Sequence, residues 1–320
     1  MGVRVAFLFP GQGAQAVGMG AALCAAEPAA RAAFDVASAA CGLDLADLCF
    51  RGPEAELGRT EVTQPAILTC SAAVLAVLRL RGVEPAAVAG LSLGEYSALL
   101  AADAAGLADL APLVRRRGRY MQDAVPLGSG GMAAVLGLSL PGVEDLCAAA
   151  CAAAGDPPPG GWVLAPANLN APGQIVIAGH QGALAQAVAL GRGMGARRVL
   201  PLPVSAPFHC ALMAPAARAL APELDSLPLR PAACPIVCNV RAEVVTEPEQ
   251  VRAALLAQCS APVLWEDGIR RLAALGCDAF IEVGPGQTLT GLVGRILPEA
   301  LAVAVCDPES LERCLQRLGR

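Results

Sequence analysis

The hydrophobic positions of the chain fall into short apolar runs that alternate with longer stretches of helical spacing. Residues 3–9 are a β-rich run that predicts a buried strand leading into a loop. Residues 21–40 have helical spacing with a break at their internal proline, and residues 65–80 predict a helix with proline near its start. The short run 86–91 is followed by a second apolar helix, and residues 107–124 predict a third. The first part of the chain therefore alternates strand and helix.

The spacing changes after Gly128, where Gly130 and Gly131 mark a probable boundary. The pattern beyond it predicts two strand–helix–strand halves, in the order strand 132–138, helix 142–154, strands 162–167 and 174–178, helix 181–194 and strand 196–202. This β-α-β-β-α-β order is that of a ferredoxin-like unit.

Strand–helix alternation resumes after residue 202, with predicted elements at 235–240, 251–258, 267–275 and 279–283. We therefore expect an α/β protein with a discontinuous large domain and a small inserted one. The expected boundaries are 1–128 and 202–320 for the large domain and 129–201 for the ferredoxin-like small domain.

Composition narrows the possible functions. Hydrophobic residues make up 55% of the chain, which is enough for a sizeable core, and the net charge of −5 argues against nucleic acid as a partner. The best candidate for a membrane span, residues 66–80, is interrupted by Thr69 and Ser71 and ends near Arg79, so no membrane segment is expected. The apolar run 5–9 is too short for the core of a signal peptide.

The thirteen cysteines are odd in number and scattered, without a Cys-x-x-Cys pair. We interpret them as reduced thiols packed as small apolar side chains. Neither of the two Cys-x3-Cys pairs has a histidine nearby, so no metal site is expected.

The pentapeptide Gly90-Leu91-Ser92-Leu93-Gly94 matches G-x-S-x-G between a predicted strand and a predicted helix. In that context the pattern predicts a nucleophile elbow, which exposes the serine at the carboxyl end of the strand and beside a helix N-terminus. The alternative is a serine that caps the helix, worth ~1 kcal/mol.

A serine nucleophile needs a base, and the chain has two histidines, His180 and His209. His180 follows a strand of the small domain, where a surface turn or a helix start is the simpler interpretation. His209 lies at a strand-to-loop-to-helix transition, the kind of position where α/β sites collect. We therefore favour His209 as the base, with a histidine buried at the domain junction as the alternative.

Two further features could bind a ligand. Gly11-Gln12-Gly13 follows the first strand, so an N–H of this loop could pair with the one after Ser92 to form an oxyanion hole, although a bare turn is equally compatible. On helix 107–124, Arg115 and Arg119 share one face and Arg117 points elsewhere. These arginines form either a solvated face or, if one turns inward, a site for a carboxylate.

These residues carry a resemblance to the malonyl-CoA:acyl-carrier-protein transacylases over nearly the full chain. The matching stretches occur in the family's order: Phe9–Gln15, Thr63–Ala66, Gly90–Tyr96, Arg117–Gln122, Asn168–Gln174, Phe208-His209 and Glu282–Gly286. The resemblance implies an α/β-hydrolase-like domain with a ferredoxin-like insert, no permanently bound cofactor, malonyl-CoA as substrate and an acyl-carrier protein as partner. It also implies a monomer in the cytoplasm, or in an organelle if a targeting peptide was removed.

The resemblance also implies a role for each matching position. Ser92 would be the acylated nucleophile and His209 its base, with the histidine oriented by the backbone carbonyl of Gln258. The remaining positions would bind substrate: the N–H groups of Gln12 and Leu93 as the oxyanion hole, Arg117 on the malonyl carboxylate, Phe208 in acyl selectivity, and Asn168 near the site.

The chain departs from the family at Leu91, where most relatives have histidine. Because His209 supplies the base, we expect activity to survive with a changed polarity beside the elbow. Fatty-acid synthesis is the expected pathway, and the alternatives are polyketide supply, a serine esterase, and a carrier-binding scaffold that has lost activity. Carrier docking would need a basic patch, for which Arg192, Arg197 and Arg198, together with Arg115 and Arg119, are candidates.

Overall fold

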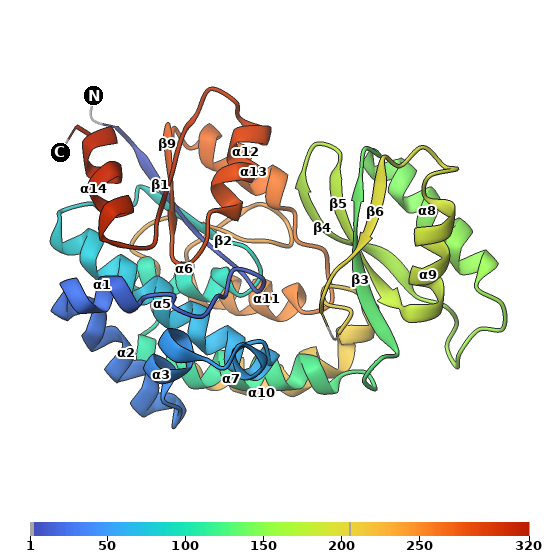
Figure 1. Cartoon of the computed structure of the whole chain (residues 1–320), viewed down its shortest axis with the longest axis horizontal. Helices are drawn as coiled ribbons and strands as arrows, with labels where there is room; N and C mark the ends of the chain where they lie inside the picture. The colour runs from blue at the N-terminus through green and yellow to red at the C-terminus, as the bar shows by residue number, and fades with distance from the viewer. Residues whose placement is uncertain (1–2, 205, 320) are drawn as a thin grey trace.

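The computed structural model describes residues 3–204 and 206–319, and within them the strands form two sheets (Figure 1). One sheet has six strands in the order β10-β9-β1-β2-β7-β8, all parallel except β8, which runs antiparallel to β7. The other has four antiparallel strands in the order β4-β5-β3-β6. The predicted α/β class with a mostly parallel sheet is confirmed.

The parallel sheet is built from segments at both ends of the chain. Its strands are β1 (Val5–Phe9), β2 (Ala87–Gly90), β7 (Ile236–Val237), β8 (Val244–Val245), β9 (Ala279–Val283) and β10 (Leu301–Val305). The accompanying helices are α1 (Ala21–Ala26), α2 (Pro28–Cys41), α3 (Leu45–Arg51), α4 (Glu54–Leu57), α5 (Thr60–Leu80), α6 (Gly94–Ala101), α7 (Leu107–Asp123), α10 (Ala214–Ser226), α11 (Pro248–Gln258), α12 (Trp265–Ala274), α13 (Thr288–Ile296) and α14 (Pro308–Arg317), with the 3-10 turn η1 (Ala211–Met213).

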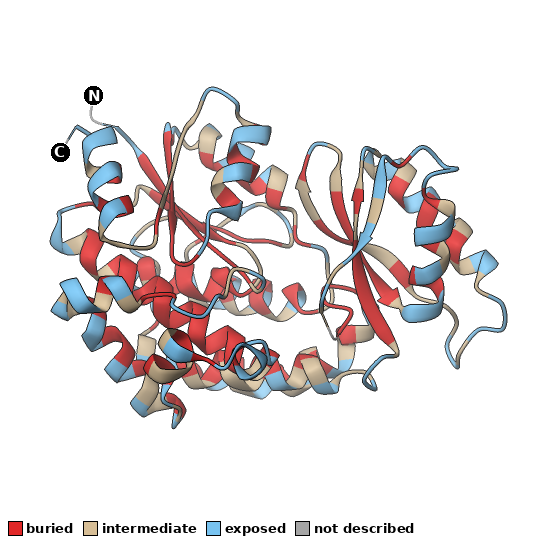
Figure 2. Ribbon diagram, in the orientation of Figure 1, coloured by how far each residue is buried: buried red, intermediate tan, exposed pale blue. Residues whose placement is uncertain are grey.

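Strand β1 shows why this sheet is covered on both faces. Successive side chains of a strand point to opposite faces, and all five residues of β1 are buried. Phe7 and Phe9 pack into a core formed with α2, α5, α6 and α7, whereas Leu8 packs into a second core with α12 and α13. Figure 2 shows this burial on both sides of the parallel strands. The apolar runs of the sequence therefore become central strands.

The antiparallel sheet contains β3 (Gly130–Leu136), β4 (Leu164–Ala171), β5 (Gln174–His180) and β6 (Arg198–Pro201), with α8 (Leu140–Ala153) and α9 (Gln181–Leu190). Its β-α-β-β-α-β order is the predicted ferredoxin-like one. One face of this sheet packs on α8 and α9 (Figure 1). The other face packs on Met121, Phe208 and Met213, which lie outside the antiparallel sheet and its two helices. The predicted domain boundaries at 128/129 and 201/202 stay predictions.

The start predicted for α5 was wrong. The helix begins at Thr60, so Pro65 lies inside it, and a single backbone bond toward Glu61 is lost. The sequence hid this because Thr60, Thr63 and Gln64 interrupt the apolar pattern, although all three are buried. With these residues α5 is long and apolar enough to cross a membrane, contrary to our expectation, yet 89% of its most apolar window is buried inside the protein. It is a core helix.

The elements after residue 283 were not assigned from the sequence. Strand β10 is a wholly apolar run in the sequence, LAVAV, and was overlooked; in the structure Val305 is buried and its other four residues are half-buried. It forms one edge of the sheet. Helix α14 begins with a capping box between Asp307 and Ser310, which was readable from the sequence and was overlooked.

The elbow between β2 and α6 depends on two glycines that permit close backbone contact. A Cβ on Gly94 would lie 2.0 Å from the carbonyl oxygen of Phe9, and one on Gly90 would lie 1.8 Å from the backbone of Gly94. Both distances are far inside van der Waals contact. Both glycines of G-x-S-x-G in this chain are therefore packing requirements of β1, β2 and α6.

We predict that Gly94→Ala lowers the free energy of unfolding by about 3 kcal/mol, because helix α6 must move away from β1. The matched control is Gly291→Ala on α13, where an added Cβ meets no atom within 4 Å and helix propensity should add up to about 1 kcal/mol. Urea unfolding monitored by circular dichroism measures both. Equal effects of the two substitutions would contradict the prediction.

Candidate active site

Ser92 lies on the sharp turn between β2 and α6, as G-x-S-x-G predicted. Its φ is 53°, in the left-handed region that residues with a Cβ rarely adopt. The turn is held by Asn239, whose Oδ1 accepts the N–H of Ser92 at 2.7 Å and whose Nδ2 donates to the carbonyl of Gly90 at 2.7 Å. One amide side chain thus holds both sides of the elbow.

Asn239 was missed by the sequence reasoning. It lies directly after β7, in the segment predicted as strand 235–240, and it is 4% exposed. A polar residue at the carboxyl end of a parallel strand was the signal that could have identified it, because the side chains at this edge of the sheet converge.

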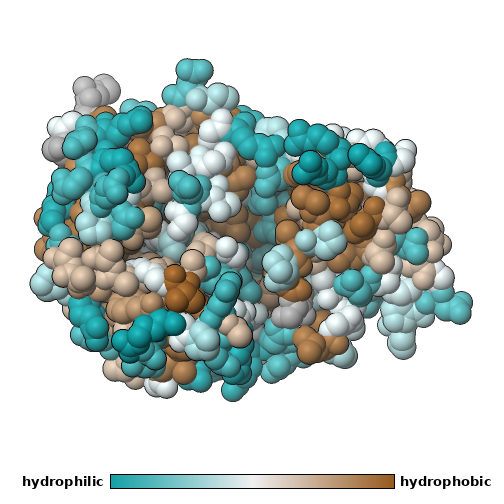
Figure 3. Space-filling view, viewed as in Figure 1, coloured by the Kyte–Doolittle hydropathy of each residue, from teal (hydrophilic) through white to brown (hydrophobic). Residues whose placement is uncertain are grey.

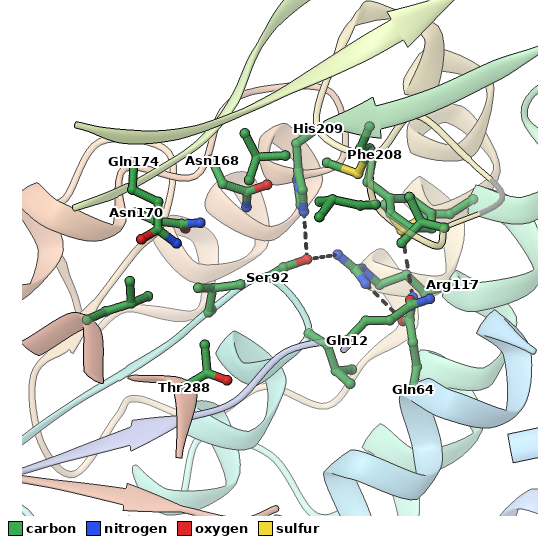
Figure 4. A pocket seen from close by; sticks show the side chains of 18 residues that line it. Gln12, Gln64, Ser92, Arg117, Asn168, Asn170, Gln174, Phe208, His209 and Thr288 are labelled. Carbon is green, nitrogen blue, oxygen red and sulfur yellow. Dashed lines mark hydrogen bonds between the residues drawn. The ribbon is translucent and has the colours of Figure 1, made fainter. Parts of the chain in front are cut away.

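His209 faces Ser92 from the loop before η1, and only 3% of it is exposed. Its Nε2 lies 2.7 Å from Ser92 Oγ (Figure 4), and its Nδ1 lies 2.8 Å from the backbone carbonyl of Gln258. Because a carbonyl oxygen can only accept, Nδ1 carries the proton and Nε2 is left free to accept the proton of Ser92. The geometry is that of a nucleophile and its general base.

Burial also keeps the imidazole neutral. The pKa of His209 falls from 6.5 to about 4, chiefly because of burial and secondly because of the positive charge of Arg117, while the hydrogen bond to the Gln258 carbonyl opposes the fall. At neutral pH the ring is therefore a proton acceptor. His180 has a different setting: its Nδ1 accepts the N–H of Val163, next to the start of α9.

Arg117 turns inward from α7 and is 1% exposed. Its Nη1 donates to Gln64 Oε1 at 2.8 Å and its Nη2 donates to Ser92 Oγ at 3.2 Å (Figure 4). The same Nη2 donates to Gln258 Oε1 at 2.9 Å. Its guanidinium lies 5.3 Å from the centre of the Tyr96 ring. Among the described residues these partners are all neutral, and no ion pair compensates the buried charge.

An uncompensated buried guanidinium is costly unless an anion meets it. The geometry therefore favours the inward-facing alternative for Arg117. Its neighbours conform to the solvated alternative: Arg119 is exposed, and half-buried Arg115 donates to the carbonyl of Cys41. The role of Gln64 was missed, although a glutamine in a long apolar helix was a visible signal.

Gln258, at the end of α11, joins these groups. In addition to its carbonyl on His209, its Nε2 donates to the backbone carbonyl of Ser92 at 3.0 Å and to Glu95 Oε2 at 2.7 Å. Glu95 is 2% exposed and also accepts the N–H of Asn239 at 3.1 Å. Burial raises the pKa of Glu95 to about 7, although hydrogen bonds and Arg117 oppose the rise. The sequence reasoning assigned Gln258 a backbone role and missed its side chain.

A cavity of about 190 Å³ opens beside Ser92, between the two sheets. It is lined by all the site residues predicted from the sequence except Gln258, namely Gln12, Ser92, Leu93, Arg117, Asn168, Phe208 and His209. Figure 4 shows Asn168 on the side of the antiparallel sheet, together with Asn170 and Gln174, and it shows Gln12 beside Arg117. The apolar side chains of Leu91 and Leu292 also line the cavity. In the described part of the chain, the backbone N–H groups of Gln12 and Leu93 have no hydrogen-bond partner.

The described residues contain no group of three or more His, Cys, Asp or Glu side chains arranged to hold a metal ion. All thirteen cysteines are free thiols, and burial raises the pKa of buried Cys70 well above its ordinary value. The chemistry available at the cavity is therefore that of a base-activated serine beside a buried cation.

The two shifted groups should change stability with pH in opposite directions. Between about pH 4 and 6.5 folded His209 binds fewer protons than the unfolded chain, so its contribution to stability rises with pH. Between 4.5 and about 7 folded Glu95 binds more protons, so its contribution falls as pH rises.

The free energy of unfolding of His209→Gln, relative to that of wild type, should therefore fall as pH rises from 4 to 6.5. The corresponding difference for Glu95→Gln should rise as pH rises from 4.5 to 7. Urea unfolding across this range measures both differences. A flat difference for either variant would contradict the corresponding shift.

The comparisons agree with this geometry. Residues 6–308 match the acyl transferase domain family. The chain is 45% identical to the malonyl CoA-acyl carrier protein transacylase of Escherichia coli K12, over 98% of this chain and 99% of the relative. The structure superimposes on that of the Coxiella burnetii malonyl CoA-acyl carrier protein transacylase with a TM-score of 0.95, at 37% identity over 100% of this chain and 99% of the other.

A third similarity is to a solved complex of a type II PKS acyl-carrier protein with its malonyl-transacylase. That chain is 40% identical, with a TM-score of 0.93 over 98% of this chain and 99% of the other. The elbow, the buried base and the full-length similarity lead to one conclusion: the chain belongs to the acyl transferase domain family.

Proposed function

We propose that the chain transfers a malonyl group from malonyl-CoA to the phosphopantetheine thiol of an acyl-carrier protein, by way of an ester on Ser92. One observation supports this above the others: the guanidinium of Arg117 is buried, has no anion in direct contact with it among the described residues, and its Nη2 lies 3.2 Å from Ser92 Oγ. An acyl group that carries a free carboxylate fits this arrangement. The names of the relatives support the same substrate and carrier.

In the proposed first half-reaction, His209 Nε2 takes the proton of Ser92 as Oγ attacks the thioester carbonyl. The N–H groups of Gln12 and Leu93 hold the negative oxygen of the tetrahedral intermediate. The intermediate collapses, and the CoA sulfur leaves with the proton from His209. Arg117 moves its hydrogen bond from Ser92 Oγ to the acyl carboxylate, which fixes the orientation of the malonyl group.

In the second half-reaction, His209 takes the proton of the carrier thiol, whose sulfur attacks the ester carbonyl. The same oxyanion hole holds the intermediate, and Ser92 Oγ leaves with the proton from His209. Each step uses groups of the chain itself, so the proposed reaction needs no bound cofactor. Because the first product leaves before the carrier reacts, the kinetics should be ping-pong.

Acyl selectivity would be set by the wall of the cavity. Phe208 lines this wall and is 7% exposed, so its ring would crowd an α-methyl group of a bulkier acyl chain. One methyl group is worth ~1–3 kcal/mol of discrimination. Asn168, also in the wall, is proposed to contact the substrate.

We propose fatty-acid synthesis as the setting. The similarity to a transacylase solved with a type II PKS carrier favours polyketide supply as the second candidate. Assaying transfer to a purified carrier of each class separates the two.

Arg117→Ala should reduce malonyl transfer to Ser92 by about 10²-fold or more, because the substrate carboxylate loses its buried partner. Acetyl transfer should change far less, and exposed Arg119→Ala is the matched control on the same helix. Intact-mass spectrometry after incubation with malonyl-CoA measures an adduct of about 86 Da on the serine nucleophile, which Ser92→Ala abolishes.

Two rival functions predict different results in this assay. An esterase for neutral acyl groups would be indifferent to Arg117→Ala. An inactive carrier-binding scaffold would acquire no adduct, even as wild type.

Carrier docking is proposed to use Arg192, Arg197 and Arg198, which are exposed at the end of α9 and on β6 and form no ion pair among the described residues. Exposed Val188 and Leu200 adjoin them, and Figure 3 shows hydrophobic side chains gathered on this part of the molecule. Carrier proteins are usually acidic, so the charges are complementary.

Reversing these three charges to glutamate should raise KM for the carrier by about 10-fold or more and leave KM for malonyl-CoA unchanged. Arg31→Glu on α2 is the control for charge alone. Equal KM values for the carrier in variant and wild type would exclude this patch.

A further inference from the structure

The side chains that hold Ser92 and Arg117 meet at a single buried carboxyl group, that of Glu95. Its Oε2 accepts the N–H of Asn239 at 3.1 Å and the Nε2 of Gln258 at 2.7 Å. Asn239 holds the backbone of the elbow, and Gln258 Oε1 accepts from Arg117. Glu95 contacts neither Ser92 Oγ nor Arg117 directly by a hydrogen bond in the described chain.

We propose that Glu95 is the positioning residue of this site: through Gln258 and Asn239 it holds the guanidinium of Arg117 and the Ser92 elbow in one arrangement, and it serves as the counter-charge of Arg117 until an acyl carboxylate binds. This inference rests on the proposed function, because it requires an anionic acyl group.

The positioning part follows from the hydrogen bonds of Gln258. A side-chain NH₂ group has two protons, and the two shortest contacts of Gln258 Nε2 are to Glu95 Oε2 and to the carbonyl of Ser92. With its nitrogen held there, its Oε1 is directed at Arg117. Glu95 accepts the shorter of these two bonds, so together with the Ser92 carbonyl it keeps the amide from flipping and offering N–H to the guanidinium.

The counter-charge part follows from the surroundings of Glu95. The hydrogen bonds that link Arg117 to Gln258 and Gln258 to Glu95 place one cation and one carboxyl group on opposite ends of a single buried amide. The other titratable groups in electrostatic contact with this pair, among the described residues, are Tyr96, Cys238, Cys259 and His209. All four are neutral at pH 7, because burial raises the pKa of Tyr96 and of both thiols and lowers that of His209.

When a malonyl carboxylate reaches Arg117, it becomes a second anion near the cation. Arg117 then stabilises the ionised form of Glu95 less, and the new carboxylate repels it. Glu95 should therefore take up a proton from solvent on binding. The burial that raises its pKa to about 7 puts this exchange within reach at neutral pH.

The first test separates positioning from charge. Glu95→Ala removes both acceptor contacts and should slow malonylation of Ser92 by about 10²-fold, whereas Glu95→Gln keeps an oxygen for both donors and should stay within about 5-fold of wild type. Glu282→Gln is the matched control, since Glu282 is a buried carboxyl group that holds the start of α13 instead. Rapid quench followed by intact-mass spectrometry measures the rates.

Malonylation of Glu95→Ala at nearly the wild-type rate would overturn the positioning role. If Glu95→Ala does not fold, as circular dichroism would reveal, the calorimetric test below still decides on Glu95. A wild type that acquires no adduct would refute the proposed function itself, which is a different failure from that of Glu95.

The second test measures the proton. Malonyl-CoA is titrated calorimetrically into Ser92→Ala at pH 7.5 in phosphate and in Tris, whose ionisation enthalpies differ, and acetyl-CoA is the control without a carboxylate. The difference between the ligands should be an uptake of roughly half a proton. It should vanish in Ser92→Ala/Glu95→Gln. Zero uptake in Ser92→Ala would overturn the counter-charge role, and uptake that persists in the double variant would assign the proton to another group and overturn it as well.

Discussion

The desolvation of one guanidinium organises this site. Arg117 is almost fully buried and, in the described chain, contacts two amide oxygens, one hydroxyl and an aromatic ring. Such a charge has given up water without gaining an ion pair by direct contact, which is among the more expensive arrangements in a protein interior. In the proposed function this cost is recovered in part when the acyl carboxylate binds, so the folded state would already contain much of the preference for a charged acyl group.

The surrounding polar residues serve more than one of the reacting groups. The main chain of Gln258 fixes the tautomer of His209, while its side chain contacts Arg117, Glu95 and the elbow. A backbone carbonyl in this place does the orienting work that a carboxylate does in a serine-hydrolase triad, without adding a negative charge. The imidazole therefore stays neutral and the nearest cation is left available to substrate.

Much of this was predictable from the sequence, and the limits have physical causes. Ser92, His209 and Arg117 stand out because a strand–serine–helix pattern, a short list of histidines and an arginine out of phase with its neighbours are local signals. Asn239 and Gln64 were missed because their partners lie 147 and 53 residues away in the chain. The side-chain role of Gln258 was missed for the same reason, although its position came from the family resemblance.

The fold shows the same division. Central strands such as β1 are uniformly apolar and were recognised, and the ferredoxin-like order followed from alternation alone. Edge strand β10 was overlooked although its five residues are all apolar, because the periodicity of so short a run does not distinguish a strand from a buried helical segment. The start of α5 was misplaced because buried threonine and glutamine side chains look like surface residues until their partners are known.

Both reacting residues hold an unfavourable backbone conformation. Ser92 and His209 have φ values of 53° and 61°, and they are two of the four non-glycine residues with positive φ that the described chain contains. Each such residue costs of order 1–3 kcal/mol. A chain selected for durability alone would carry glycine or asparagine at both places. The two strained turns therefore lower the stability of the folded chain, and they keep Ser92 and His209 aligned before any substrate is present.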